Sequence, residues 1–179
     1  NEPDISTLAL FEKVIWFTGD AYADIGIGSA GPGTSGEAAL GSWLDTGKCL
    51  LISSQDYLYD HGFTPFMGNY LGVETAIGEA AHTVITGTSS IFGGLGPYTL
   101  DYSIFEGNLS DQITPDSTAE LAFQGDNGDA AVNKDNGVYK TTYWGFPMAA
   151  IADPADRQAA LAAFLNWCGY RIFIPMIMR

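Results

Sequence analysis

The chain has 179 residues, enough for one domain with a substantial core, and its 46% hydrophobic content is not that of a disordered protein. Twenty-one acidic residues against seven basic ones give a net charge of −14, which argues against nucleic acid or an anionic membrane as partner and leaves cations as possible ligands. No apolar run reaches the ~20 residues that span a bilayer, so we expect no membrane span.

The first third of the chain has the pattern of a β-α-β unit. Lys13 to Phe17 is an apolar run that predicts a buried parallel strand, and a glycine-rich loop follows it. We expect a helix capped by Ser35 and ending at Gly47. Cys49 to Ser53 then predicts a second strand that is covered on both faces. The residues after this strand would lie at the carboxyl edge of a sheet, where α/β proteins bind their ligands.

The middle of the chain is richer in turns than in regular periodicity. Thr64 and Pro65 predict the start of a short helix that runs to Leu71, and Ala81 to Thr86 is a candidate strand. The stretch from residue 87 to 129 reads mainly as loop. Lys134 to Gly137 is flanked by strand-like segments and predicts a hairpin.

The clearest helix begins after the cap Asp153, with apolar residues spaced to form one face. We expect this face and the two strand runs to form a single core. Its members would be Val14, Ile15, Trp16, Leu50, Leu51, Ile52, Leu161, Phe164 and Leu165. The remaining residues, 170–179, form an apolar tail interrupted by Pro175, which suits an edge strand or a docking segment.

The chain has two cysteines, Cys49 and Cys168. We expect two buried free thiols, with a disulfide between them as the alternative. The only histidines are His61 and His82, and the sequence has no CxxC motif, so a zinc site is not expected.

Three stretches occur in an order that resembles class I glutamine amidotransferase-like domains, in particular a variant found in exported multidomain bacterial proteins. They are KVIWFTGDAY from Lys13, DTGKCLLISSQDYLYD from Asp45 and YKTTYWGFPMAAI from Tyr139. The resemblance covers most of the chain. It implies an α/β fold over residues 1–169, a flavodoxin-like three-layer sandwich with a mostly parallel sheet, plus a C-terminal β-hairpin region.

Domains of this kind begin with a β-α-β unit ahead of the strand that corresponds to Lys13 to Phe17. Here only Asn1 to Glu12 precede that strand, so this unit is expected to be missing. We therefore expect another protein segment or subunit to complete the sheet, since an unpaired apolar edge strand promotes association.

The motifs with which the active amidotransferases work are replaced in this sequence. In place of the cysteine elbow G-x-C-x-G stand Ser53 to Tyr57, and in place of the His-Pro-Glu base motif stand Phe146 to Met148. The resemblance thus implies a non-catalytic module without a cofactor. We expect it to act as a structural or interaction domain of a protein that is secreted or lies at the cell surface.

Two other functions remain open. One is an enzyme, a hydrolase or amidotransferase, with an unrecognised site near Ser54 and Asp56, in which His61 or His82 would serve as the base. The other is a sugar-binding or calcium-binding module. The aromatic candidates for a sugar-binding face are Tyr57, Tyr59, Tyr70, Trp144 and Phe146. The weak calcium candidates are Asp126, Asp129 and Asp135, whose residue types are equally common in hairpin turns.

Polar and aromatic residues near the predicted strand ends are the candidates for a ligand pocket. They are Thr18, Asp20, Ser54, Gln55, Asp56 and Phe146. The alternative interpretation is that the polar members cap helices and satisfy loop amides.

Overall fold

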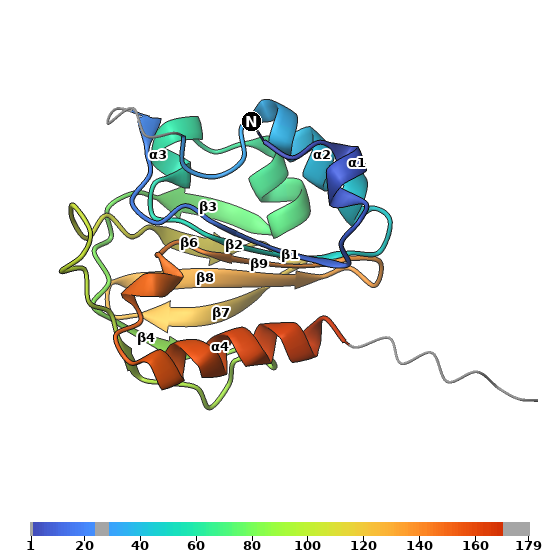
Figure 1. The fold of residues 1–179 in the computed structure, drawn as a ribbon. Helices are drawn as coiled ribbons and strands as arrows, with labels where there is room; N and C mark the ends of the chain where they lie inside the picture. The colour runs from blue at the N-terminus through green and yellow to red at the C-terminus, as the bar shows by residue number, and fades with distance from the viewer. Residues whose placement is uncertain (1, 24–28, 170–179) are drawn as a thin grey trace, which may run out of the picture.

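A seven-stranded sheet organises the chain (Figure 1). It is described from a computed structural model that places residues 2–23 and 29–169. The strands of the structure are β1 Lys13–Phe17, β2 Cys49–Ser53, β3 Val73–Ile77, β4 Val84–Gly87, β5 Tyr98–Thr99, β6 Gln112–Pro115, β7 Glu120–Gly125, β8 Gly128–Asp135 and β9 Lys140–Trp144. The main sheet has the order β1-β2-β9-β8-β7-β4-β5, and β3 pairs antiparallel with β6 in a separate ribbon.

Helical segments and the β3–β6 ribbon cover the two faces of this sheet unequally. The helical segments are α1 Ile5–Leu8, α2 Thr34–Leu44, α3 Tyr57–His61, the π-helical turn η2 Met67–Leu71, the short turn η3 Met148–Ala150 and α4 Pro154–Trp167. Figure 1 shows α1, α2 and α3 together with β3 on one face of the sheet, and α4 with the short turn η3 on the other. The carboxyl end of β2 leads directly into α3.

Several local predictions are confirmed. β1 and β2 pair in parallel, as the β-α-β pattern requires, and β2 pairs in parallel with β9. β8 and β9 form the predicted antiparallel hairpin around Lys134 to Gly137. Asp153 caps α4 by accepting a hydrogen bond from the Ala155 amide, and Pro154 occupies its first turn.

The prediction of a flavodoxin-like sandwich with a mostly parallel sheet is wrong. Only the β1–β2 and β2–β9 pairs are parallel, and the remaining pairs of a strongly curled, mixed sheet are antiparallel. The reason lies between Val84 and Trp144, where short turns rather than helices connect β7, β8 and β9. Strands joined by short turns must run antiparallel, since a parallel connection needs a crossover of a dozen residues or more.

The prediction of a single core is also wrong, because the sheet separates two cores. Leu51 packs with Phe164 on the α4 face, whereas Leu50 and Ile52 pack with α2 and η2 on the opposite face. Successive residues of a strand point to opposite faces, so an unbroken apolar run necessarily serves both. Ile15 belongs to neither core and remains 36% exposed.

The expectation of free thiols at Cys49 and Cys168 is corrected by a disulfide between them. The two Cα atoms are 5.8 Å apart although 119 residues separate the cysteines in sequence. The bond ties the beginning of β2 to the end of α4 and so fixes this long helix against its face of the sheet. Sequence alone gave no reason to bring these two residues together, because their contact depends on how α4 crosses the sheet.

β1 lies at the edge of the main sheet. The segment before it forms α1, whose Leu8 packs into the core on the α2 face, while Phe17 of β1 is 66% exposed. The predicted apolar tail, residues 170–179, lies outside the described residues. Within the part of the chain that the structure places, no helix has the length and apolar character needed to cross a membrane, in line with the expectation from the sequence.

Two truncations test which apolar strand residues are buried in a core and which are partly exposed. We expect Leu51→Ala to lower the free energy of unfolding by ~2–5 kcal/mol, because Leu51 is fully buried between the sheet and α4. Ile15→Ala should cost less than ~1 kcal/mol, because its side chain is partly exposed on the edge strand. Denaturant unfolding of both variants measures the difference, and equal losses would contradict the described burial.

Candidate functional site

The turn that follows β2 is held by its serine hydroxyl groups. Ser53 Oγ donates to the Phe146 carbonyl oxygen (2.9 Å) and accepts from the Met148 amide (2.7 Å). Ser54 Oγ accepts from Thr18 Oγ1 (2.8 Å) and from the Asp56 amide (3.3 Å). These four bonds connect the carboxyl ends of β1, β2 and β9, so both hydroxyl groups have structural partners.

The two histidines lie away from these serines. His61 Nε2 is 2.7 Å from Ser29 Oγ, at the end of α3. His82 is buried, and its Nδ1 accepts from the Asn127 amide at 3.3 Å. Burial lowers the pKa of His82, which keeps the ring neutral at physiological pH. The pairing of Ser54 with either histidine, as the enzyme hypothesis requires, is not among the hydrogen bonds of the described residues.

A pocket of about 520 Å³ opens beside the residues that follow β2. Gln55 and Asp56 come from the turn after β2, Gly78 and Glu79 follow β3, and Asp111 directly precedes β6. The full lining consists of Tyr22, Gln55, Asp56, Leu58, Tyr59, Gly78, Glu79, Leu109 and Asp111. The pocket therefore lies where the carboxyl ends of the parallel strands meet the β3–β6 ribbon, in the position that α/β sheets use for ligands.

Two carboxyl groups of this pocket are buried without full hydrogen bonding. Asp56 and Asp111 are each 2% exposed, and in the described structure Oδ2 of each has no hydrogen-bond partner. The same is true of Gln55 Nε2 and of the Tyr143 hydroxyl group. Buried polar atoms in native proteins almost always have a partner, so a cluster of exceptions indicates a place where a bound group supplies one.

Burial also changes the acidity of both carboxyl groups. It raises the pKa of Asp56 to about 6. The nearby Gln55 side chain opposes this shift, and the neighbouring carboxylates of Asp20, Asp60 and Glu106 add to it. Burial raises the pKa of Asp111 well above its usual range, with a further contribution from Asp56. Desolvation and like charges both disfavour the ionised form, and a cationic group placed beside these carboxyl groups would favour it.

The backbone around Asp111 is fixed by close packing. The Asp111 amide donates to the Gly145 carbonyl oxygen at 2.6 Å, and a Cβ atom on Gly145 would lie 2.8 Å from the Asp111 carbonyl oxygen. Glycine is thus required for β9 to approach the segment before β6 so closely.

The pocket segment that follows β3 stores backbone strain. Glu79 and Ala81 have φ angles of 60° and 57°, in the left-handed region that residues with a Cβ atom rarely adopt. Hydrogen bonds from the Ala81 amide to the Ser110 carbonyl oxygen (3.2 Å) and from the His82 amide to Ser110 Oγ (2.8 Å) hold this segment. Strain of this kind persists only where the surroundings enforce it, often beside functional sites.

Of the six residues predicted to form a ligand pocket, two line the pocket and four do not. Gln55 and Asp56 line the pocket. Thr18 and Ser54 bond to each other beneath it, and the carboxylate of Asp20 accepts from the Glu106 amide (3.1 and 3.0 Å). Phe146 lies in the α4-side core, stacked on Trp144 with ring centroids 5.5 Å apart.

Sequence reasoning missed the pocket residues that follow β3 and precede β6. Glu79, Leu109 and Asp111 lie in the turn-rich middle of the chain, where no periodic pattern marks them. Tyr59 was predicted only as part of a sugar-binding face, and it does line the pocket. Asp56 was found because it follows a predicted strand, whereas Asp111 precedes the short strand β6, so the same signal could not have found it.

The weak calcium candidates have other partners. Asp126 accepts hydrogen bonds from the Thr83 amide and hydroxyl groups. Asp135 accepts from the Gly137 amide at 3.0 Å and lies 3.6 Å from Lys140 Nζ, while Asp129 is a residue of β8. No group of three or more His, Cys, Asp or Glu side chains within residues 2–23 and 29–169 is arranged to hold a metal ion. Asp126 and Asp135 therefore act in turns.

Comparison with known proteins gives the fold and no family. No family model and no curated protein matches the chain. Among solved structures it is similar to an exo-β-1,4-mannosidase from an Opitutaceae bacterium (TM-score 0.53, 21% identity, covering 92% of this chain and 26% of the mannosidase). It is also similar to a ThuA-like protein from Bacteroides uniformis (TM-score 0.56, 9% identity, covering 92% of this chain and 72% of that protein).

A third similar structure is the β-galactosidase from Bacillus circulans (TM-score 0.52, 14% identity, covering 76% of this chain and 21% of the galactosidase). The chain thus spans about a quarter of the mannosidase and a fifth of this galactosidase. These identities show a shared fold only, and none of the three names mentions a glutamine amidotransferase-like domain.

Removing a buried charge from the pocket should stabilise the protein. Because the folded-state pKa of Asp111 is raised, its contribution to stability is present below the unfolded pKa of 3.8 and is lost as the pH rises through the folded value. We expect Asp111→Asn to raise the free energy of unfolding at pH 7.5 by about 1–3 kcal/mol and to change it little at pH 4.

The control for this prediction is Asp101→Asn. Hydrogen bonds from the Ser103 backbone and side chain lower the pKa of Asp101, so its contribution is present above pH 3.8 and is lost as the pH falls. That variant should be destabilised at pH 7.5. Thermal unfolding between pH 4 and 8 measures both trends, and a lower melting temperature of Asp111→Asn at pH 7.5 would contradict the account.

Proposed function

We propose that this chain is a non-catalytic, amidotransferase-like binding module whose ligand occupies the pocket beside α3. The observation that carries the proposal is the pair of buried carboxyl groups, Asp56 and Asp111, each with an oxygen that has no partner among the described residues. Such groups cost folding free energy, and proteins retain such costs chiefly at functional sites. The strained backbone at Glu79 on the same pocket wall supports this interpretation.

The surroundings of the elbow support the non-catalytic part of the proposal. Ser53 and Ser54 stand where the resembled family has its nucleophile, and their hydroxyl groups bond to backbone atoms and to Thr18. Phe146 stands where that family has its base, and its side chain is buried in the α4-side core. Neither position offers a group that could move a proton to or from a substrate.

The proposed setting is a larger protein in an oxidising compartment outside the cytoplasm. The disulfide between Cys49 and Cys168 supports this, because such bonds persist mainly in exported proteins. The similarity to a domain-sized part of a much longer mannosidase agrees with a role as one module among several.

The binding role can be tested with a variant that fills the pocket. A Cβ atom on Gly78 would meet only Asp111 Oδ1, at 3.6 Å, so a leucine at this position can enter without displacing backbone. In a ligand-observed NMR screen of small fragments, we expect binders of the wild-type chain whose signals are lost with Gly78→Leu. Gln158→Leu, which adds a leucine on the exposed side of α4, should leave these signals unchanged.

Two results would overturn the proposal. One is a screen in which Gly78→Leu affects no binder. The other is glutaminase or esterase turnover by the wild-type chain that Ser54→Ala abolishes, since a working nucleophile at the elbow would make the chain an enzyme.

A second candidate function, association through β1, is favoured by the exposure of the edge strand. Among residues 2–23 and 29–169, β1 has a paired neighbour in the sheet on one side only, β2, and Ile15 and Phe17 are 36% and 66% exposed on the same face. Burying apolar area contributes ~25 cal/mol per Å², so pairing this edge with another segment or subunit would be favourable. We propose that a second chain completes the sheet at β1.

If the chain associates through β1, the purified chain in solution should have a mass above that of a monomer. We expect a concentration-dependent dimer by sedimentation velocity, with Phe17→Ser shifting the equilibrium toward monomer at least about tenfold, as loss of a buried aromatic contact would. Phe63→Ser, which removes an exposed phenylalanine side chain that does not belong to β1, is the control. A folded chain that stays monomeric up to high concentration would contradict this role.

A further inference from the structure

The pocket lies in a strongly acidic part of the molecule. Three carboxylates line it, and three more act on Asp56 closely enough to raise its pKa. The three that line the pocket are Asp56, Glu79 and Asp111. The three that act on Asp56 are Asp20, Asp60 and Glu106. Like charges gathered around a concave, poorly solvated site produce a negative potential that concentrates cations there.

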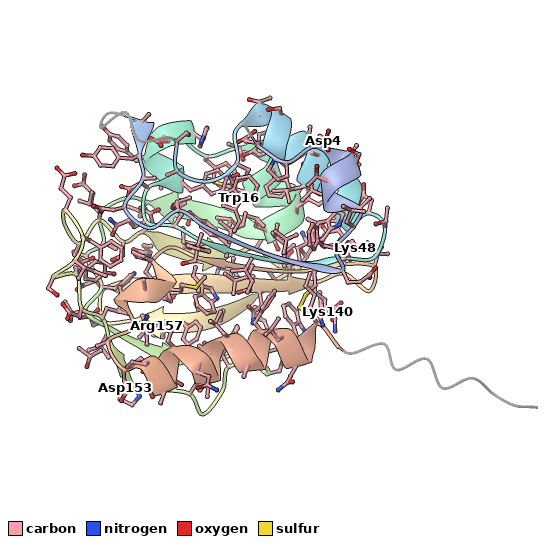
Figure 2. All side chains as sticks on the ribbon, viewed as in Figure 1. Asp4, Trp16, Lys48, Lys140, Asp153 and Arg157 are labelled. Carbon is pink, nitrogen blue, oxygen red and sulfur yellow. A yellow bond between two sulfur atoms is a disulfide. The ribbon has the colours of Figure 1, made fainter. Side chains whose placement is uncertain are left out.

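The basic side chains lie elsewhere in the described structure. Lys13, Lys48 and Lys140 stand at or just before the amino ends of the parallel strands, and Lys134 near the end of the antiparallel β8. Figure 2 shows Lys48 and Lys140 at the edge of the sheet opposite to α3. Arg157 donates to the Ile151 carbonyl oxygen (2.8 Å) on the α4 side. No ion pair with a lysine or arginine is formed by Asp56 or Asp111 among these residues.

Aromatic and aliphatic side chains form the rest of the pocket wall. The rings of Tyr22 and Tyr59 meet edge to face, with centroids 6.3 Å apart, and Leu58 and Leu109 lie beside them. The Tyr22 hydroxyl group donates to Glu106 Oε2 at 2.7 Å, which fixes one ring in place. Tyrosine rings attract cations through their faces and also pack well against the carbon skeleton of a sugar or an alkyl chain.

The unpartnered atoms specify the polar groups that a ligand must carry. The free Oδ2 atoms of Asp56 and Asp111 are acceptors and call for donors, preferably charged ones. Gln55 Oε1 already accepts from the Leu109 amide at 3.3 Å. Its Nε2 group lies near enough to Asp56 to lower that residue's pKa but forms no hydrogen bond in the described structure, so it is a donor that calls for an acceptor such as a hydroxyl oxygen. A metal ion satisfies only the first requirement, and the carboxylates are not grouped to hold one within the described residues.

We infer that the ligand of this pocket is a small hydroxylated organic amine, with its ammonium group at Asp56 and Asp111, a hydroxyl oxygen at Gln55 and its carbon skeleton against Tyr22 and Tyr59. This inference rests on the proposed binding function and adds the chemical class of the ligand. A neutral sugar would make similar hydroxyl and ring contacts and would leave both carboxylates without a countercharge. An anion would be repelled by all six carboxylates.

The test compares two compounds that differ in one group. Isothermal titration calorimetry at pH 7.5 and low salt measures binding of D-glucosamine and of D-glucose, which carry an ammonium and a hydroxyl group on the same carbon. We expect glucosamine to bind at least about tenfold more tightly, since its ammonium group donates charge-assisted hydrogen bonds to the carboxyl groups and a hydroxyl group does not. Calcium chloride, used alone as the metal probe, should not produce a pocket-dependent signal.

Variants locate the ammonium group. Asp111→Asn and Asp56→Asn should each weaken glucosamine binding about 10-fold or more and leave glucose binding nearly unchanged. Asp135→Asn removes the same unit of charge at the far edge of the sheet, where salt screens its effect, so glucosamine binding should change less than about twofold. Asp111→Asn is also expected to be more stable than the wild type, so a loss of binding cannot be attributed to unfolding.

The outcomes separate this inference from the function on which it rests. Equal binding of glucose and glucosamine, or equal losses with Asp111→Asn and Asp135→Asn, overturns the inference and leaves a pocket that binds neutral compounds. Pocket-dependent fragments that are all neutral or anionic have the same consequence. If no fragment depends on the pocket, the proposed function falls as well.

Discussion

The parallel pairing of β2 between β1 and β9 is the constraint on which the site depends. It brings three strands to end at the same edge of the sheet, and the hydroxyl groups of Ser53 and Ser54 then connect those ends. Gln55 and Asp56 follow at once and are thereby presented to the pocket. The remaining strand pairs of the main sheet are antiparallel, and the residues that follow β3 and precede β6 complete the lining of the pocket.

Contacts at the amino ends of the parallel strands and groups at their carboxyl ends have opposite effects on stability. At the amino ends, the disulfide joins Cys49 to Cys168, and Lys48 pairs with Glu12 at 2.6 Å. These contacts stabilise the fold. At the carboxyl ends, buried carboxyl groups with raised pKa values reduce stability at neutral pH. A protein can maintain so costly a site because the free energy gained elsewhere offsets it, and stability and function commonly oppose each other in this way.

The fold by itself does not assign a function. Glycosidases and a ThuA-like protein share it at 9% to 21% identity, and the same architecture can serve unrelated roles. The proposed binding function therefore rests on the side chains of one pocket, on their burial and on polar atoms that lack a hydrogen-bond partner among the described residues. The proposed association rests in the same way on the exposure of Ile15 and Phe17 rather than on the strand order alone.

The sequence by itself determined the local elements: the runs at Lys13 and Cys49, the β8–β9 hairpin, the capped helix at Asp153 and the polar turn at Gln55 and Asp56. Each follows from short-range preferences of neighbouring residues. Only the tertiary structure decided the mixed sheet, the two separate cores and the disulfide, because these depend on how distant segments cross. It also brought Asp111 to Asp56, since the close approach at Gly145 joins two segments that no periodic pattern connects.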